Sequence, residues 1–362
     1  MTDEAAGPSR RPPRPADAHP VAKPHWASRF EDVLFRLVSP WLVSRGWVPR
    51  VLGYTGYGSS GWVRVLGRVV LAPRGRRGQA PDERPDPERG WRAFLSVPVP
   101  AHRVRVEIDE QSYDVVTDRG GYIDLRLDAQ LPPGWHPVTL RTAGDVAANC
   151  DVRIVAPDAT LGVVCDIDDT VMVTHLPRPF LAAWNSFVLK EHARRPVTGM
   201  ARLLQSVVDA DPEAAVVYLS TGAWNVAPTI ERFLARHEFP PGPLLLTDWG
   251  PTNTGWFRSG IEHKCSALRR LADELPAVRW VLVGDDGQHD PKIYADFASE
   301  CPRAVRGVAI RQLTPVEQVL SSGTPGPARD SDGHTAPPAV PWVTGPDGRS
   351  LGSQLRQEGV LD

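Results

Sequence analysis

The chain has 362 residues, more than one hydrophobic core usually needs, so we expect two folded units. Its 41 basic and 43 acidic residues give a net charge of −2, which offers no general attraction to nucleic acid or to anionic lipid. The four cysteines stand apart without a Cys-x-x-Cys pair, which excludes a zinc site of that type and favours a reducing, cytoplasmic environment.

The N-terminal residues predict a disordered stretch followed by one helix. Residues 1–25 are rich in Pro, Arg and Ala and lack the apolar segment of a signal peptide. Residues 26–45 place Phe30, Leu34 and Trp41 at helical spacing. This amphipathic helix either docks on the neighbouring domain or lies on a membrane surface. No run of about 18 apolar residues occurs in the sequence, so we expect no transmembrane segment.

Residues 46–157 predict a small β-sandwich-like domain. Residues 103–108 and 122–127 alternate strictly between apolar and polar side chains, as strands with one buried face do. Between them lies the turn sequence Asp118-Arg119-Gly120-Gly121. The Pro- and Arg-rich residues 73–91 predict a long loop. No pattern in this domain indicates chemistry.

Residues 158–321 predict an α/β domain, because short apolar runs alternate with helical patterns. We expect strands at 161–165, 215–219, 244–246, 280–283 and 307–310, and helices at 198–209, 226–237, 263–275, 291–300 and 314–321. Such alternation favours a Rossmann-like parallel sheet with helices on both faces, which binds ligands beyond the carboxyl ends of its strands. Residues 322–362 are rich in Gly, Pro and Ser and predict a flexible tail.

Three aspartates follow the first of these strands, in the sequence Asp166-Ile167-Asp168-Asp169-Thr170. Carboxylates this close repel one another unless a cation offsets their charge. Mg²⁺ prefers oxygen ligands and commonly binds one or two carboxylates together with a phosphate oxygen. Asp166 could then attack phosphorus, with Asp168 as general acid and base. The alternative is an acidic loop without chemistry.

A hydroxyl pair and a lysine follow later in the chain. Ser220 and Thr221 end the second strand and could hold a phosphate oxygen with N–H groups of the next helix, although they would equally suit an N-cap. Lys264 is expected in the first turn of its helix, where a cation opposes the helix dipole. It either neutralises the phosphate and Asp166 or is an ordinary surface lysine.

The fourth strand is followed by three more aspartates. Asp285 is placed to complete the magnesium shell, and Asp286 could compete with it for the metal. Asp290 is a further candidate ligand, but Asp290 followed by Pro291 also suits an N-cap with proline in the first helical turn.

The order of these motifs resembles the haloacid dehalogenase superfamily, with Asp169 standing where glycine is more usual. Residues 166–170, 263–264 and 284–294 are similar to phosphatidate phosphatases of the fungal actin-patch type and their bacterial relatives, with Asp286 where that family usually has Ser. The resemblance implies a haloacid dehalogenase-like fold and Mg²⁺-dependent hydrolysis of phosphatidate to diacylglycerol and phosphate through an aspartyl-phosphate. It assigns catalysis to Asp166 and Asp168, phosphate binding to Ser220, Thr221 and Lys264, and the metal to Asp166, Asp168, Asp285 and Asp290.

A phosphatidate substrate implies a phospholipid partner at a membrane surface, and so a cytoplasmic protein that attaches peripherally. Apolar residues between the first two motifs, among them Phe180 and Trp184, fit either core packing or a cap that admits acyl chains. Two other functions stay open: a phosphatase of a soluble phosphomonoester or phosphoprotein, and a binding module in which the phosphatase fold is only a scaffold.

Overall fold

The computed structural model describes residues 38–73, 97–143, 147–173, 194–247, 256–287, 289–315, 317–318 and 340–361. The chain divides into two compact units, the first ending at Ile154 and the second covering Val155–Asp362 with two short earlier stretches. Across the described ranges, no helix is both long enough and apolar enough to cross a membrane.

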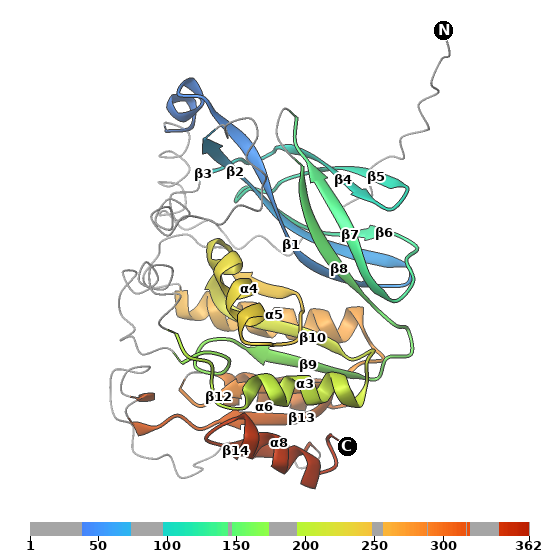
Figure 1. The fold of residues 1–362 in the computed structure, drawn as a ribbon, viewed down its shortest axis with the longest axis vertical. Helices are drawn as coiled ribbons and strands as arrows, with labels where there is room; N and C mark the ends of the chain where they lie inside the picture. The colour runs from blue at the N-terminus through green and yellow to red at the C-terminus, as the bar shows by residue number, and fades with distance from the viewer. Residues whose placement is uncertain are drawn as a thin grey trace. The chain divides into compact units, whose positions relative to one another are not determined.

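The first unit is one curled sheet of eight strands (Figure 1). The strand order is β3-β2-β1-β8-β7-β4-β5, and β6 also pairs with β2. The strands are β1 (Trp47–Ser59), β2 (Trp62–Pro73), β3 (Val97–Pro98), β4 (Arg103–Ile108), β5 (Gln111–Val116), β6 (Tyr122–Asp128), β7 (Gly134–Arg141) and β8 (Ala148–Val155).

The core of this unit is formed by the inward side chains of the alternating strands, among them Val63, Val106, Leu140 and Ile154. The two strictly alternating segments are strands, as predicted, and Asp118 accepts hydrogen bonds from the N–H groups of Gly120 (2.8 Å) and Tyr122 (2.7 Å) in the turn before β6. The unit predicted to be β-sandwich-like is one continuous, curled sheet, and its long β1–β2 ladder carries a bulge at Tyr54/Tyr57, a feature that adds local twist.

Only part of the predicted N-terminal helix is described. Residues 38–44 are helical, and Leu42 packs against Leu71 and Val97, which agrees with docking on the adjacent sheet. Trp41 is 52% exposed. Residues 26–37 and 74–96, which include most of the predicted long loop, lie outside the described residues.

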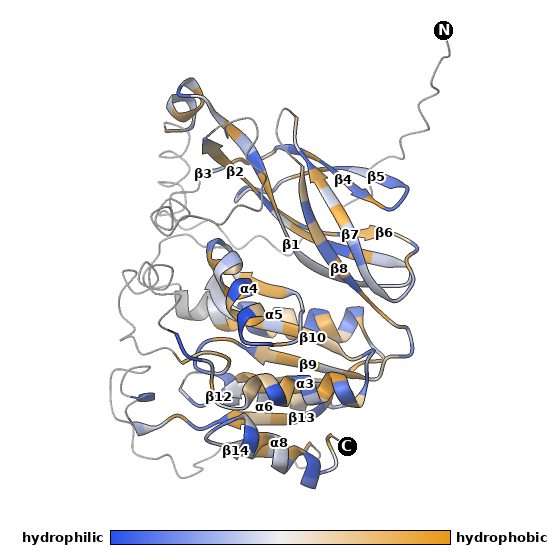
Figure 2. Ribbon diagram, viewed as in Figure 1, coloured by the Kyte–Doolittle hydropathy of each residue, from blue (hydrophilic) through white to orange (hydrophobic). Residues whose placement is uncertain are grey.

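The second unit is a parallel sheet of six strands in the order β11-β10-β9-β12-β13-β14. Its strands are apolar along most of their length (Figure 2), and β9 is buried at every residue. The strands are β9 (Leu161–Asp166), β10 (Ala215–Ala223), β11 (Leu244–Thr247), β12 (Arg279–Asp285), β13 (Val305–Arg311) and β14 (Trp342–Gly345).

Helices flank this sheet. Helix α3 contacts α8, and α5 contacts α6, with α3 in front of the sheet and α5 behind it in Figure 1. The helices are α3 (Met200–Ala210), α4 (Ala227–Arg236), α5 (Trp256–Glu274), α6 (Asp290–Glu300) and α8 (Gly348–Gln357), with short 3-10 turns at Trp224–Val226 and Pro302–Ala304. The parallel sheet and its interleaved helices confirm the predicted α/β class.

The predicted flexible tail is wrong for residues 340–361. Strand β14 extends the sheet by pairing with β13, and Asp347 caps α8 by accepting a hydrogen bond from the N–H of Ser350 (2.9 Å). The N–H of Gly348 donates to the carbonyl of Thr198 (3.0 Å), and a Cβ on Gly348 would lie 2.5 Å from the Gly199 backbone. The close approach of α8 to α3 therefore requires glycine at this position.

Two helix boundaries were predicted with different success. The helix predicted at 314–321 begins with a capping box, because the N–H of Glu317 donates to Thr314 Oγ1 (3.3 Å) and the N–H of Thr314 donates to Glu317 Oε2 (2.8 Å). Helix α5, however, begins at Trp256, so Lys264 lies in its third turn and not in the first. The opposition to the helix dipole expected for Lys264 therefore does not apply.

Candidate active site

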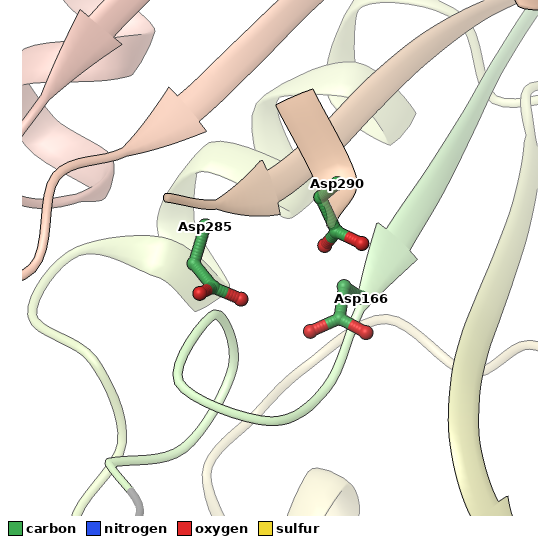
Figure 3. A group of neighbouring side chains, drawn as sticks. All are labelled: Asp166, Asp285 and Asp290. Atoms are coloured by element: carbon green, nitrogen blue, oxygen red, sulfur yellow. The ribbon is translucent and has the colours of Figure 1, made fainter. Parts of the chain in front are cut away.

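Three of the predicted acidic residues meet at the carboxyl end of the central strands. Asp166 ends β9, Asp285 ends β12, and these strands pair with each other. Asp290 begins α6. A carboxylate oxygen from each of the three lies within 4.8 Å of the others, and Figure 3 shows the three side chains directed toward a common point. The residues are thus brought together from two strand ends and a helix start.

Lys264 joins two of these carboxylates. Its Nζ donates to Asp166 Oδ1 (2.6 Å) and to Asp290 Oδ1 (2.5 Å). The three side chains are 3%, 2% and 1% exposed, so the lysine is not an ordinary surface residue. Gly260, one turn earlier in α5, allows the helix to pass close to the end of β10, because a Cβ there would lie 3.1 Å from Thr221 Cγ2.

The charge of the cluster favours a bound cation. Burial raises the pKa of Asp166 to about 8; Lys264 opposes this, whereas Asp290 and Asp168 add to it. Burial and the neighbouring carboxylates also raise the pKa of Asp285 well above its usual range. Asp166 Oδ2 and Asp290 Oδ2 are buried without a hydrogen-bond partner among the described residues. Buried carboxylate oxygens with no donor suit a hard divalent cation such as Mg²⁺.

Asp168 lies beside the predicted phosphate-binding hydroxyl and is not one of the three grouped carboxylates. Ser220 Oγ donates to Asp168 Oδ2 (3.1 Å) and accepts from the N–H of Gly222 (2.9 Å). The Asp168 carboxylate therefore contacts Ser220 and lies outside the group formed by Asp166, Asp285 and Asp290.

Both N-cap alternatives are wrong. Ser220 and Thr221 belong to the end of β10, and α4 begins at Ala227 after an intervening 3-10 turn. The N–H groups at the start of α4, which were expected to help hold the phosphate, therefore do not directly follow Ser220 and Thr221 in the sequence. His289 occupies the N-cap position of α6 without a side-chain cap bond, while the Asp290 side chain binds Lys264.

The structure distinguishes Asp290 from Asp286. Asp286 Oδ1 accepts the N–H of Leu313 (2.8 Å), so this carboxylate is used to hold the end of β13. Asp285 Oδ1 accepts the N–H of Gly287 (2.7 Å), and Thr170 Oγ1 donates to Asp285 Oδ2 (3.4 Å). Because Asp286 is bound to Leu313, it does not join the group of carboxylates and does not compete with Asp285 for a metal ion.

Asn substitutions test this distinction. Asp290→Asn is expected to lower the affinity for Mg²⁺ at least about 10-fold, because it removes one charge from the cluster. Asp286→Asn should leave the affinity unchanged, since the amide oxygen can still accept from Leu313. Titration calorimetry with Mg²⁺ measures both. Equal losses in the two variants would contradict the assignment.

Gly284 makes room for Asp290. A Cβ at this position would lie 2.6 Å from Asp290 Oδ2 and 2.8 Å from the Tyr294 ring. Gly284→Ala is therefore expected to displace the carboxylate and weaken Mg²⁺ binding by about 10-fold to 100-fold, as changes that misalign a ligand do. Gly61→Ala is the control, because its Cβ would meet no atom closer than 3.8 Å. Unchanged calorimetric affinity in Gly284→Ala would show that Asp290 is not a ligand.

Sequence reasoning missed two contacts of the site. Thr170 was noted only as the end of the first motif, yet its hydroxyl reaches Asp285. Arg311 donates from Nη1 to the carbonyl of Asp169 (2.6 Å). It immediately follows the predicted strand 307–310, so the rule on strand ends could have identified it.

Comparisons with known proteins agree with this site. The family described as the catalytic domain of phosphatidate phosphatase APP1 matches residues 161–312, which include every side chain of the cluster. A phosphatidate phosphatase APP1 from Saccharomyces cerevisiae is 23% identical over 235 residues, covering 60% of this chain and 39% of that protein. An uncharacterised protein of Schizosaccharomyces pombe is 23% identical over 154 residues, covering 42% of this chain and 25% of the other.

The chain thus spans less than half the length of these curated relatives. Likeness to solved structures is weak: a carbohydrate acetylesterase from Xanthomonas citri aligns with a TM-score of 0.28 at 11% identity, covering 73% of this chain and 68% of that one. This likeness carries no argument about fold or function. The family match confirms the resemblance seen in the motifs: residues 161–312 match the family described as the catalytic domain of phosphatidate phosphatase APP1.

Proposed function

We propose that the chain is a Mg²⁺-dependent phosphatase that hydrolyses phosphatidate to diacylglycerol and phosphate. The observation that carries the proposal is the buried pairing of Asp166 with Lys264 beside Asp285 and Asp290, within the segment that matches the family. The strand order, with Asp166 at the end of a central parallel strand, supports a haloacid dehalogenase-like arrangement of the domain.

Asp166 is the proposed nucleophile. One of its carboxylate oxygens attacks phosphorus, the bond from phosphorus to the glycerol oxygen breaks, and an aspartyl-phosphate forms. Lys264 holds Asp166 in place and balances its charge. A divalent ion held by Asp166, Asp285 and Asp290 would offset the negative charge of the phosphate.

Asp168 is the proposed acid and base. Its carboxyl proton passes to the departing glycerol oxygen, which leaves as the hydroxyl of diacylglycerol. The resulting carboxylate then takes a proton from water, and the water oxygen attacks phosphorus and releases Asp166. The hydrogen bond from Ser220 orients the Asp168 carboxylate for these transfers. Ser220 and Thr221 are the proposed contacts for the phosphate oxygens.

The proposed substrate places the protein at a membrane surface as a peripheral, cytoplasmic enzyme. We propose that the catalytic domain comprises residues 158–321 together with residues 340–361, which complete its sheet. The S. cerevisiae relative named as a phosphatidate phosphatase supports the choice of substrate.

One assay tests the proposal. Phosphate release by the full chain is measured from phosphatidate in vesicles and from soluble phosphomonoesters, with Mg²⁺ and with a chelator. We expect release from phosphatidate with Mg²⁺ only. Preference for soluble esters, with no response to vesicles, would favour a soluble phosphomonoester or phosphoprotein as substrate. No release from any substrate would favour a binding module.

A further inference from the structure

Arg311 is a buried, permanently charged side chain that connects three separate segments. Nη1 donates to the carbonyl of Asp169 (2.6 Å), and Nε donates to the carbonyl of Pro346 (3.3 Å). Nη2 forms an ion pair with Glu317 Oε1 (2.7 Å). The planar guanidinium therefore has acceptors in the first motif, in the capping box after β13 and in the turn between β14 and α8.

The segment held at Asp169 has an unusual backbone. Asp169 has a φ of 57°, in the left-handed region that few residues other than glycine adopt. Its N–H donates to the carbonyl of Met172 (2.9 Å), while its own carbonyl receives Arg311. The next residue, Thr170, donates its hydroxyl to Asp285. A displacement of this loop would therefore also disturb the Asp285 carboxylate through its contact with Thr170.

We propose that Arg311 is a positioning residue of the active site. It fixes the 167–172 loop in its left-handed turn and, through Thr170, the orientation of Asp285. Because Glu317 and Pro346 lie beyond residue 312, this geometry depends on a segment outside the part of the chain that matches the family. The effect on turnover rests on the proposed phosphatase function, whereas the effect on the loop does not.

Arg306 provides a matched control on the same strand. Its Nε donates to the carbonyl of Val360 (2.7 Å), so it too attaches the C-terminal segment to β13. Among the described residues, Arg306 forms no hydrogen bond or ion pair with the 167–172 loop, unlike Arg311. Replacing Arg306 tests the general effect of losing a contact between β13 and the C-terminal segment. Replacing Arg311 also removes the contact with the 167–172 loop.

Hydrogen exchange of the full chain, followed by mass spectrometry, measures how strongly Arg311 stabilises the 167–172 loop. The N–H groups of Asp169, Val171 and Met172 are hydrogen-bonded within it. In Arg311→Gln, the exchange of a peptide covering 167–172 is expected to accelerate about 10-fold, because a buried charged hydrogen bond is lost. Arg306→Gln should leave this peptide unchanged. Equal exchange in wild type and Arg311→Gln would overturn the proposal.

Kinetics supply a second readout. With phosphatidate vesicles, Arg311→Gln is expected to lower kcat about 10-fold with little change in KM, because the loop orients groups that act in the chemical step. Arg311→Lys should recover part of the loss, since an ammonium can still donate to the Asp169 carbonyl. A general loss of stability would instead affect Arg306→Gln equally, and that result would contradict the proposal.

Glu317→Gln covers the case in which Arg311→Gln does not fold. This change removes the negative partner of Arg311 but keeps a side-chain oxygen for Thr314. We expect faster loop exchange than in Arg306→Gln, and unchanged exchange would overturn the proposal. If the wild-type chain releases no phosphate from phosphatidate, the proposed function fails, and the exchange experiment still decides the role of Arg311.

Discussion

Replacing Asp166 with Asn is expected to lower phosphate release from phosphatidate at least about 10⁴-fold, as loss of an attacking group does in other hydrolases. An amide oxygen is a poor nucleophile and cannot form the aspartyl-phosphate. The fold should persist, because Lys264 keeps its bond to Asp290 and one of the three crowded carboxylates is gone. Phosphate release and thermal unfolding are measured on the same samples.

The control for this substitution is Asp296→Asn. Asp296 is 61% exposed and pairs with Lys292 one turn earlier in α6, so its loss should leave turnover unchanged. Wild-type turnover in Asp166→Asn would show that a different group attacks phosphorus. If Asp166→Asn loses both turnover and the folded state, phosphate release and thermal unfolding are measured in Asp168→Asn instead. That change leaves the contacts of Lys264 with Asp166 and Asp290 in place.

Replacing Lys264 with Met is expected to lower both turnover and stability. Burial disfavours the lysine ammonium, but the two carboxylates outweigh burial and raise the pKa of Lys264 above its ordinary value. Without the lysine, Asp166 and Asp290 remain buried with no positive partner, which costs about 3–5 kcal/mol in the free energy of unfolding. Turnover should be lost as well, because Asp166 is no longer oriented. Denaturant unfolding with a chelator measures the first effect.

Lys292→Met is the matched control, since it breaks a lysine–aspartate pair that is exposed on both sides. Its effect on unfolding should stay below about 1 kcal/mol. Saturating Mg²⁺ should reduce the loss of stability in Lys264→Met, because a cation can replace the missing positive charge. Similar free energies for the two lysine variants in chelator would contradict the buried pairing.

The parallel sheet could be predicted because its strands are short, apolar and followed by polar residues. Val163 and Val164 are buried on both sides of the sheet, so this strand reads as a continuous apolar run. The rule that parallel strands present their carboxyl ends together then placed Asp166 and Asp285 in one site. The bond between Lys264 and Asp290 could not be predicted, because it depends on how α5 packs against α6.

Other features depend on tertiary contacts that local patterns do not encode. Strand β14 has only four residues between Pro341 and Pro346, and it becomes a strand by pairing with β13. Helix α5 begins at Trp256, earlier than predicted, and the added turns contain Gly260, a weak helix former that lets the helix approach Thr221. Curling of the first sheet follows from the twist of a long hairpin, which composition does not specify.

The position of β14 and α8 at the edge of the sheet has a consequence for synthesis on the ribosome. All the proposed catalytic side chains emerge before these elements, yet Arg311 reaches one of its acceptors only after Pro346 has been translated. A nascent chain can therefore collapse around β9 and β12 with its acidic loop still unsupported. A chain that ends before this point is therefore expected to lack one of the acceptors that hold Arg311 against the Asp169 loop.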